Sequence, residues 1–184
     1  MRFQTVVLPT YLKLNSRAYR MLKGYDKKGR RVFIFQMKNF DTEKLKVDDL
    51  YRTHFMMMEI LMDSMDQSSV TGFVTISDVK DTTLSHVTAM SNPVTMKKST
   101  TVFQDAYPVR PKAMHIMNVP GIFENVVSVF RGLLNAKMKE RFNVHTGGGD
   151  LSILHEAVGK DILPEEYGGT NGTLQDHTGN WQYF

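Results

Sequence analysis

The chain has 184 residues, of which 41% are hydrophobic, and it contains no cysteine. This length suits one domain with a substantial core, and a chain without cysteine has neither disulfides nor a thiol nucleophile. Its longest apolar runs, such as Val32 to Phe35, are far too short to span a bilayer, and the N-terminal residues hold no stretch typical of a secretion signal. We therefore expect a cytoplasmic protein.

The net charge of +4 is distributed unevenly along the chain. Residues 1 to 31 carry nine Lys and Arg against the single Asp26, a balance of +8, and the remaining residues carry fourteen against eighteen, a balance of −4. A basic segment can bind nucleic acid or an anionic membrane. Here apolar side chains such as Tyr11, Leu14 and Tyr19 are interspersed among the cations, and no nucleic-acid-binding motif accompanies them. We expect no nucleic acid partner.

Strand and helix patterns alternate along the chain. Apolar, β-rich runs predict strands at Val32 to Phe35, Gly72 to Val79, Lys112 to Val119 and Phe142 to His145. Helical periodicity predicts helices at Val47 to Met65, Leu84 to Ala89, Pro93 to Ala106, Val119 to Arg141 and Leu151 to Val158. This alternation is typical of an α/β fold in which helices cover a largely parallel sheet.

The predicted helix from Val119 to Arg141 combines an apolar stripe with cations. Eight apolar side chains fall on one side of it: Ile122, Phe123, Val126, Val127, Val129, Phe130, Leu133 and Leu134. Lys137 and Arg141 continue that side beyond the stripe. Two interpretations remain open. The segment is either a core helix whose cations suit its C-terminal dipole, or a helix that meets a membrane.

Sequence patterns for catalysis and metal binding are missing. Gly147-Gly148-Gly149 lacks the Lys-Ser/Thr of a phosphate loop, and His155-Glu156 lacks the second histidine of a zinc-protease helix because position 159 is glycine. The six histidines are scattered singly, as structural histidines usually are. We therefore predict no catalytic residue, no metal site, no cofactor and no enzymatic activity.

Three stretches resemble, in this order and spacing, the CRAL-TRIO lipid-binding domain family. They are YPVRPKAMHIMNVPGIF from Tyr107, LNAKMKERFNVH from Leu134 and DILPEEYGG from Asp161, and GFVTISDV followed by LSH adds support. The likeness is to the branch that contains alpha-tocopherol transfer protein, cellular retinaldehyde-binding protein and clavesin. It implies an α/β CRAL-TRIO fold, with a mostly parallel mixed sheet that floors a closed apolar cavity. Over the cavity, a mobile lid helix would run from Val119 to Leu134.

The resemblance also implies a function and its residues. The chain would bind one small hydrophobic lipid and transfer it between membranes without catalysis, docking peripherally and reversibly on membranes that contain phosphatidylinositol bisphosphate. The implied cavity residues are Phe55, Met58, Met62, Ile76, Leu84, Ser85, Ile122, Phe123, Val126, Val129, Phe130 and Leu133. The implied phosphoinositide-binding residues are Arg110, Lys112, Lys137 and Arg141. Plain core packing stays open for each cavity residue, and a lipid-regulated scaffold module without transfer activity stays open for the chain.

The ends of the chain carry two further expectations. Family members have a helical bundle ahead of this domain, so we expect residues 1 to 23 to be a basic lead, with Lys13 to Lys23 a helix-like remnant of that bundle, and residues 24 to 184 to be the lipid-binding domain. The segment Leu163 to Gly169 is expected to pin the chain end against the sheet. Asp81 and Thr82 replace a glycine and a bulky aromatic of the tocopherol-transfer relatives, so vitamin E is not carried over as the ligand.

Overall fold

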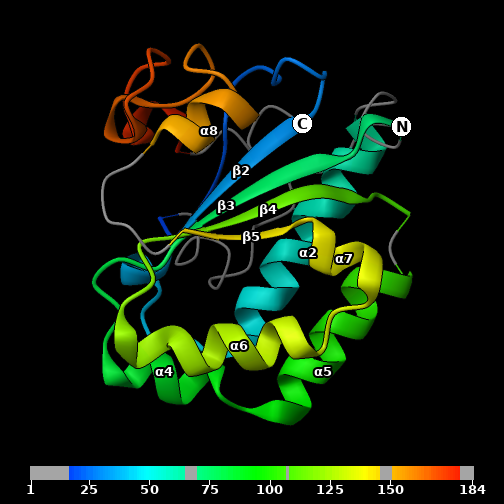
Figure 1. Cartoon of the computed structure of the whole chain (residues 1–184), viewed down its shortest axis with the longest axis vertical. Helices are drawn as coiled ribbons and strands as arrows, with labels where there is room; N and C mark the ends of the chain where they lie inside the picture. The colour runs from blue at the N-terminus through cyan, green and yellow to red at the C-terminus, as the bar shows by residue number, and fades with distance from the viewer. Residues whose placement is uncertain (1–16, 65–69, 107, 146–150, 179–184) are drawn as a thin grey trace, which may run out of the picture.

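A five-stranded sheet forms the centre of the computed structural model, which describes residues 17–64, 70–106, 108–145 and 151–178. The strands are β1 (Tyr19–Met21), β2 (Arg31–Gln36), β3 (Phe73–Asp78), β4 (Pro111–Met117) and β5 (Phe142–His145), in this spatial order. The edge strand β1 is antiparallel to β2, and β2 to β5 are parallel to one another. This confirms the predicted mixed, mostly parallel sheet (Figure 1).

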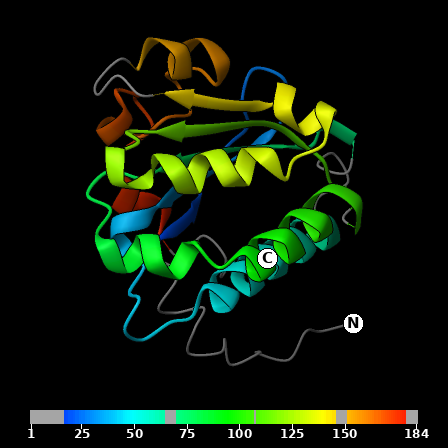
Figure 2. The same cartoon turned by 60° about the horizontal axis from the view of Figure 1, so that its bottom comes forward.

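Helices connect the parallel strands, because a parallel pair needs a crossover rather than a tight hairpin. The connecting helices are α2 (Val47–Ser64), α4 (Leu84–Met90), α5 (Pro93–Thr101), α6 (Glu124–Gly132) and α7 (Ala136–Glu140). α2, α4, α5 and α6 all lie on one face of the sheet, while α8 (Ser152–Ala157) covers the other face (Figures 1 and 2). One-turn segments complete the order: η1 (Met37–Asn39), the π-helical η2 (Val102–Ala106), η3 (Gly121–Phe123), η4 (Glu165–Tyr167) and η5 (Leu174–His177).

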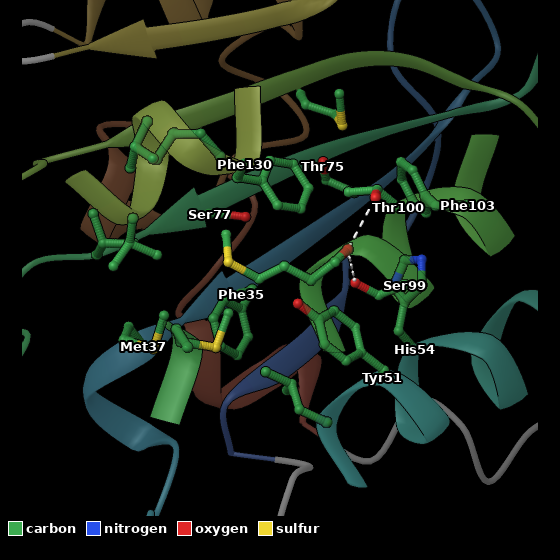
Figure 3. Close-up of a pocket in the computed structure, with 18 of the residues that line it drawn as sticks. Phe35, Met37, Tyr51, His54, Thr75, Ser77, Ser99, Thr100, Phe103 and Phe130 are labelled. Carbon is green, nitrogen blue, oxygen red and sulfur yellow. Dashed lines mark hydrogen bonds between the residues drawn. The ribbon is translucent and has the colours of Figure 1, made fainter. Parts of the chain in front are cut away.

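The two faces of the sheet belong to two separate cores, because successive strand residues point to opposite faces. Val74 and Ile76 of β3 pack with Leu154 of α8 on one face. Phe73 of the same strand packs toward the helices on the other face. Thr75 and Ser77 share the side of Phe73, where they face a cavity instead of a filled core (Figure 3).

The predicted helix from Val119 to Arg141 is divided into η3, α6 and α7. α6 ends where the Leu133 amide donates to the carbonyls of Val129 and Phe130. Asn135 then begins α7, because its side-chain oxygen accepts a hydrogen bond from the Met138 amide at 2.9 Å. The apolar cover and the cations that follow it therefore belong to two helices with different directions, not to one.

The basic lead also differs from its expectation. Within the predicted helix-like segment Lys13 to Lys23, Tyr19–Met21 forms the edge strand β1, because its side chains are buried and its backbone pairs with Phe33 to Phe35. Several other parts of the sequence predictions lie outside the described residues: Lys13 to Ser16, the helix end at Met65, and Gly147 to Gly149.

The C-terminal segment is held against the sheet by a buried tyrosine. Tyr167 is 3% exposed, and its hydroxyl donates to Asp78 Oδ2 at 2.9 Å, at the carboxyl end of β3. Asn118 donates to the other oxygen of Asp78 at 2.9 Å. Gly168 has φ +66°, and a Cβ at Gly169 would lie 1.9 Å from the Leu163 carbonyl oxygen, so both glycines are needed for the turn. This is the architecture expected for Leu163 to Gly169.

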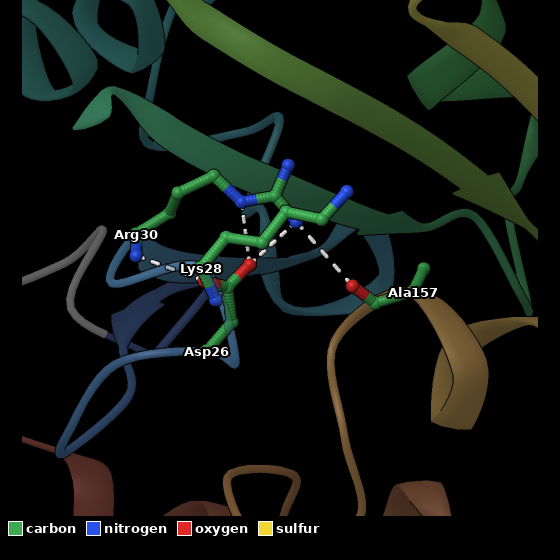
Figure 4. Close-up of polar contacts among 4 residues, drawn as sticks. All are labelled: Asp26, Lys28, Arg30 and Ala157. Carbon is green, nitrogen blue, oxygen red and sulfur yellow. Dashed lines mark hydrogen bonds and ion pairs between the residues drawn. The ribbon is translucent and has the colours of Figure 1, made fainter.

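A buried ion pair ties the turn before β2 to α8. Asp26 and Arg30 make contacts at 2.5 Å, and their side chains are 0% and 10% exposed. Asp26 Oδ1 also accepts hydrogen bonds from the Lys28 and Arg30 amides at 2.9 and 2.8 Å. Arg30 Nη2 reaches the Ala157 carbonyl at 3.3 Å (Figure 4). The guanidinium therefore neutralises a carboxylate that is closed off from water.

Replacing Arg30 by Met should destabilise the fold by about 3–5 kcal/mol, because Asp26 would keep a buried charge without its partner. Urea unfolding followed by circular dichroism measures the change. Lys44→Met is the matched control, since Lys44 makes its ion pair with Asp41 at the surface. Equal urea midpoints for Arg30→Met and the parent would contradict the stabilising role of Arg30 toward Asp26.

Candidate functional site

A cavity of about 180 Å³ lies between helices α2, α5 and α6 and the face of the sheet that these helices cover. Its described walls hold no Asp, Glu, Lys or Arg side chain. Aromatic and methionine side chains from the sheet strands and from the helical segments on this face form much of the wall: Phe35, Met37, Phe55, Met90, Met96, Phe103, Met114, Phe123, Phe130 and Phe142. Such a wall favours an uncharged, apolar occupant.

Most hydroxyl groups on the α2 and α5 side of the cavity already have protein partners. Ser99 and Thr100 donate to the Met96 carbonyl at 3.0 and 2.9 Å (Figure 3). Tyr51 is hydrogen-bonded to Ser99, and burial raises the pKa of its phenol. These groups therefore contribute little free hydrogen-bonding capacity to the cavity.

His54 of α2 is the exception among the polar groups of the wall. Its Nδ1 lies 2.5 Å from the Tyr19 hydroxyl, whereas its buried Nε2 has no hydrogen-bond partner among the described residues. Burial lowers the pKa of the imidazole from 6.5 to about 4, and burial also raises the pKa of Tyr19. Both side chains are therefore neutral at pH 7.

Four of the residues implied for the cavity line it, and they come from α2 and from the cover formed by η3 and α6. They are Phe55, Phe123, Val126 and Phe130. Met58, Met62 and Leu133 lie in the adjoining core without lining the cavity.

Five implied cavity residues lie elsewhere, which corrects the expectation for each. Ile76 is fully buried against α8, because its place in β3 directs it to the opposite face from Thr75 and Ser77. Leu84 and Ser85 occupy the first turn of α4 and are exposed, Leu84 by 72%.

The remaining two of these five, Ile122 and Val129, are 55% and 51% exposed. The reason is that the buried stripe of η3 and α6 is narrower than the apolar arc of the sequence. Phe123, Val126 and Phe130 follow the spacing of one helix face, and Ile122 and Val129 lie at its border.

A second hollow, called the cationic hollow below, lies beside the cavity, and three cationic residues and one acidic residue, Asp105, line it. Arg110 precedes β4, Lys137 lies on α7 and Arg141 follows α7, and all three border this hollow. Arg141 Nη1 donates to the Pro111 carbonyl at 2.8 Å, which fixes the guanidinium beside the start of β4. Lys112 does not line the hollow, because its aliphatic stem packs against Gly72, where a Cβ would lie 2.9 Å from Lys112 Cγ.

Gln104 of η2 holds the α6–α7 junction next to this hollow. Its side-chain oxygen accepts from the Asn135 amide at 2.6 Å, and its Nε2 donates to the Leu133 carbonyl at 3.3 Å. The neighbouring Phe103 is, among the described residues, the one side chain that lines both the apolar cavity and the cationic hollow. Phe103 therefore borders both sites.

The CRAL/TRIO domain family matches residues 16–169 of the chain. The chain belongs to this family. Among curated proteins it is 33% identical over 175 residues to the mouse (Mus musculus) alpha-tocopherol transfer protein-like protein, covering 94% of this chain and 49% of that protein. It is 27% identical over 148 residues to Clavesin-2 of Rattus norvegicus, covering 80% of this chain and 44% of that protein. The chain therefore spans about half the length of the curated relatives it matches.

A solved structure supports the CRAL/TRIO fold. The crystal structure of Sfh5 superimposes with a TM-score of 0.69 at 22% identity, covering 90% of this chain and 59% of that one. This likeness concerns the fold alone. Together with the family match, it confirms the fold class and the family expected from the sequence motifs.

Two kinds of feature are absent from the described residues. No helix in this part of the chain is long and apolar enough to cross a membrane. No group of three or more His, Asp or Glu side chains there could hold a metal ion.

Sequence reasoning missed the polar part of the CRAL/TRIO cavity. Thr75 and Ser77 lie on its wall, yet their polarity gave no reason to place them in a lipid site. His54 carried a signal, because it occurs on the apolar side of the predicted helix together with Leu50, Met57 and Met58. A histidine at such a position is surrounded by apolar neighbours, which raises the question of which groups form hydrogen bonds with its ring nitrogens.

The neutral state of His54 predicts a pH dependence of stability. The unfolded chain takes up a proton at this side chain below pH 6.5, whereas the folded chain does so only near pH 4. The stability that His54 contributes is therefore complete above pH 6.5 and is lost as the pH falls toward 4, by about 3 kcal/mol. Between pH 7 and pH 4, the free energy of unfolding of His54→Phe should fall by about 3 kcal/mol less than that of the parent, as measured by urea titrations. Parallel pH curves for the parent and the variant would contradict the prediction.

Proposed function

We propose that this chain binds one neutral hydrophobic lipid in its cavity and exchanges it at membranes that contain phosphatidylinositol bisphosphate. The observation that carries the proposal is the cavity itself, an apolar space with no charged side chain on its described walls, covered by the amphipathic helix α6. Membership in a family of lipid-binding and lipid-transfer proteins agrees with this chemistry.

The size of the cavity supports a movable cover. Apolar cavities of about 150 Å³ hold a molecule the size of benzene, and this one measures about 180 Å³. A lipid with a long chain therefore needs more room than this conformation offers. Because Val126 and Phe130 of α6 face the cavity, an outward displacement of α6 would enlarge it and would open a path to the surface.

The outer side of the cover is suited to a bilayer. Ile122 of η3 and Val129 of α6 are more than half exposed, and Leu84 of the neighbouring α4 is 72% exposed. Exposed apolar side chains of this kind can enter the acyl region of a membrane, while the inner side of the same helix contacts the ligand.

The cationic hollow supplies an electrostatic attraction to the same surface. Lys137 and Arg110 are exposed, and Arg141 is held beside them by its bond to Pro111. Three cations around one hollow suit the phosphates of an inositol head group, which Arg binds as a fork and Lys as a point charge. Lys112 is not included in the proposed head-group site, because its stem is directed to Gly72.

Two substitutions on α6 separate the two roles of this helix. Val126→Asp should abolish uptake of a fluorescent hydrophobic lipid, because it places an unpaired charge in the apolar cavity. Val129→Asp, on the exposed side, should keep uptake and should weaken binding to vesicles about tenfold, since one apolar contact with the bilayer is lost. Uptake is measured by fluorescence and vesicle binding by flotation, with circular dichroism as the check of folding. A folded Val126→Asp variant with parental uptake would exclude α6 from the binding site.

The cations are tested with a second pair of variants. Replacing Arg110 and Lys137 together by Gln should weaken binding to vesicles that contain phosphatidylinositol bisphosphate roughly thirtyfold, at about 1 kcal/mol for each cation. Binding of this variant should also depend less steeply on ionic strength than binding of the parent.

The matched control for the cations replaces Lys97 and Lys98, which are exposed on α5 and do not line the hollow. It removes the same charge and should leave vesicle binding close to the parental value. If the control loses as much as the Arg110/Lys137 variant, the attraction is diffuse and there is no specific head-group site.

A further inference from the structure

His54 leaves one hydrogen-bonding position unused in the wall of the cavity. The side chain is 8% exposed, and its Nε2 has no partner among the described residues, although the rest of the ring is held firmly. A buried polar atom without a partner is destabilising, so native structures rarely keep one without a reason. A ligand that supplied the missing partner would recover this free energy on binding.

The Tyr19 contact determines what Nε2 can offer. If the Tyr19 hydroxyl donates to Nδ1, the single ring proton of the neutral imidazole is on Nε2, which then donates. If Nδ1 donates to Tyr19, Nε2 carries a lone pair and accepts. A hydroxyl group satisfies both arrangements, because it donates and accepts equally well.

The surroundings of His54 exclude a charged group at this place. Rings of Tyr19, Phe55, Phe73 and Phe103 surround the imidazole, with centroids 5.4 to 6.2 Å away. No cation among the described residues lines the cavity, so an ionised carboxylate or phosphate would lie there without a counter-ion. A neutral oxygen is the polar group that this environment tolerates.

We propose that His54 Nε2 forms a hydrogen bond with a single neutral hydroxyl of the bound lipid, so that the Tyr19–His54 pair selects alcohols over hydrocarbons and acids. This inference rests on the proposed carrier function and names the class of its ligand. The hydroxyl lies at the α2 and α5 wall, and the apolar body of the lipid extends below α6.

Access to Nε2 requires a ring to move. Nε2 is closed off from water, and of its aromatic neighbours Tyr19, Phe55 and Phe103 also line the cavity. Phe103 is only partly buried and belongs to the π-helical segment η2, so we expect its ring to be the one that turns. The lipid hydroxyl therefore enters beside the ring of Phe103.

A competition experiment tests the selection. The parent and His54→Phe are incubated with vesicles that contain equal amounts of hexadecanol, hexadecane and hexadecanoic acid. The protein is then reisolated, and its lipids are extracted and quantified by gas chromatography. The parent should take up hexadecanol in preference to both other probes, and the ratio of hexadecanol to hexadecane should fall about tenfold in His54→Phe.

Two further variants separate the hydrogen bond from the shape of the ring. His54→Gln keeps a polar side chain that can donate and accept, and it should restore part of the preference for hexadecanol. Tyr51→Phe removes another hydroxyl of the cavity wall, and it should lower the ratio of hexadecanol to hexadecane much less than His54→Phe does. An equal loss in Tyr51→Phe would assign the preference to general cavity polarity and would overturn the role of His54.

A measurement on the parent does not depend on the folding of any variant. With ¹⁵N-labelled histidine, the Nε2 resonance of His54 should shift on addition of hexadecanol and should stay in place on addition of hexadecane. An unshifted Nε2 resonance in protein that has taken up hexadecanol overturns the inference.

The outcomes distinguish the inference from the carrier function. Equal uptake of hexadecanol and hexadecane by the parent, or a preference for the acid, overturns the selection by His54 and leaves a lipid carrier. Uptake of none of the three probes by the folded parent overturns the carrier function and the inference together.

Discussion

The arrangement of this molecule depends on the two-sided burial of a parallel sheet. β2 to β5 are parallel, so their connections are helical crossovers, and α2, α4, α5 and α6 all lie on the same face. The other face must still be covered, because its residues Val74 and Ile76 are as apolar as those of a core. The C-terminal segment provides this cover, which explains why Tyr167 is hydrogen-bonded to Asp78 and why α8 is tied to Arg30. Because this segment covers one face of the sheet, the crossover helices can enclose a cavity on the other face.

How much of the fold and of the cavity could be predicted depends on which structural property each residue type indicates. Apolar runs located the four parallel strands, because β-branched and aromatic residues in short runs report burial in a sheet. These apolar runs do not indicate which face of the sheet a given side chain points to. Both faces are buried, and the apolar Ile76, which the family resemblance implies for the cavity, packs on the other face, whereas the polar Thr75 and Ser77 line the cavity. The strand alternation was visible in the sequence, but the difference between a filled core and a cavity was not.

The cover of the cavity shows a second limit. Leu133 and Leu134 continue the apolar periodicity of α6, so the helical pattern ran on to Arg141 without a break. The division at Asn135 is produced by local hydrogen bonding, through its cap on Met138 and its contact with Gln104, a residue 31 positions earlier. Arg110, Lys137 and Arg141 line one hollow, whereas the stem of Lys112 packs against Gly72, at a point where the pairing of β3 and β4 shifts register.

The separation of charge and apolar space follows from these positions. Cations gather in a hollow at the start of β4 and around α7, outside the cavity, and the described cavity walls hold neutral groups alone. An anion is attracted to the outer hollow, where water screens it, and a neutral molecule is favoured inside, where no counter-ion exists. Phe103 borders both spaces, and on its inner side it covers His54. A shift of this one ring would therefore change the shape of the cationic hollow and the access to the imidazole at the same time.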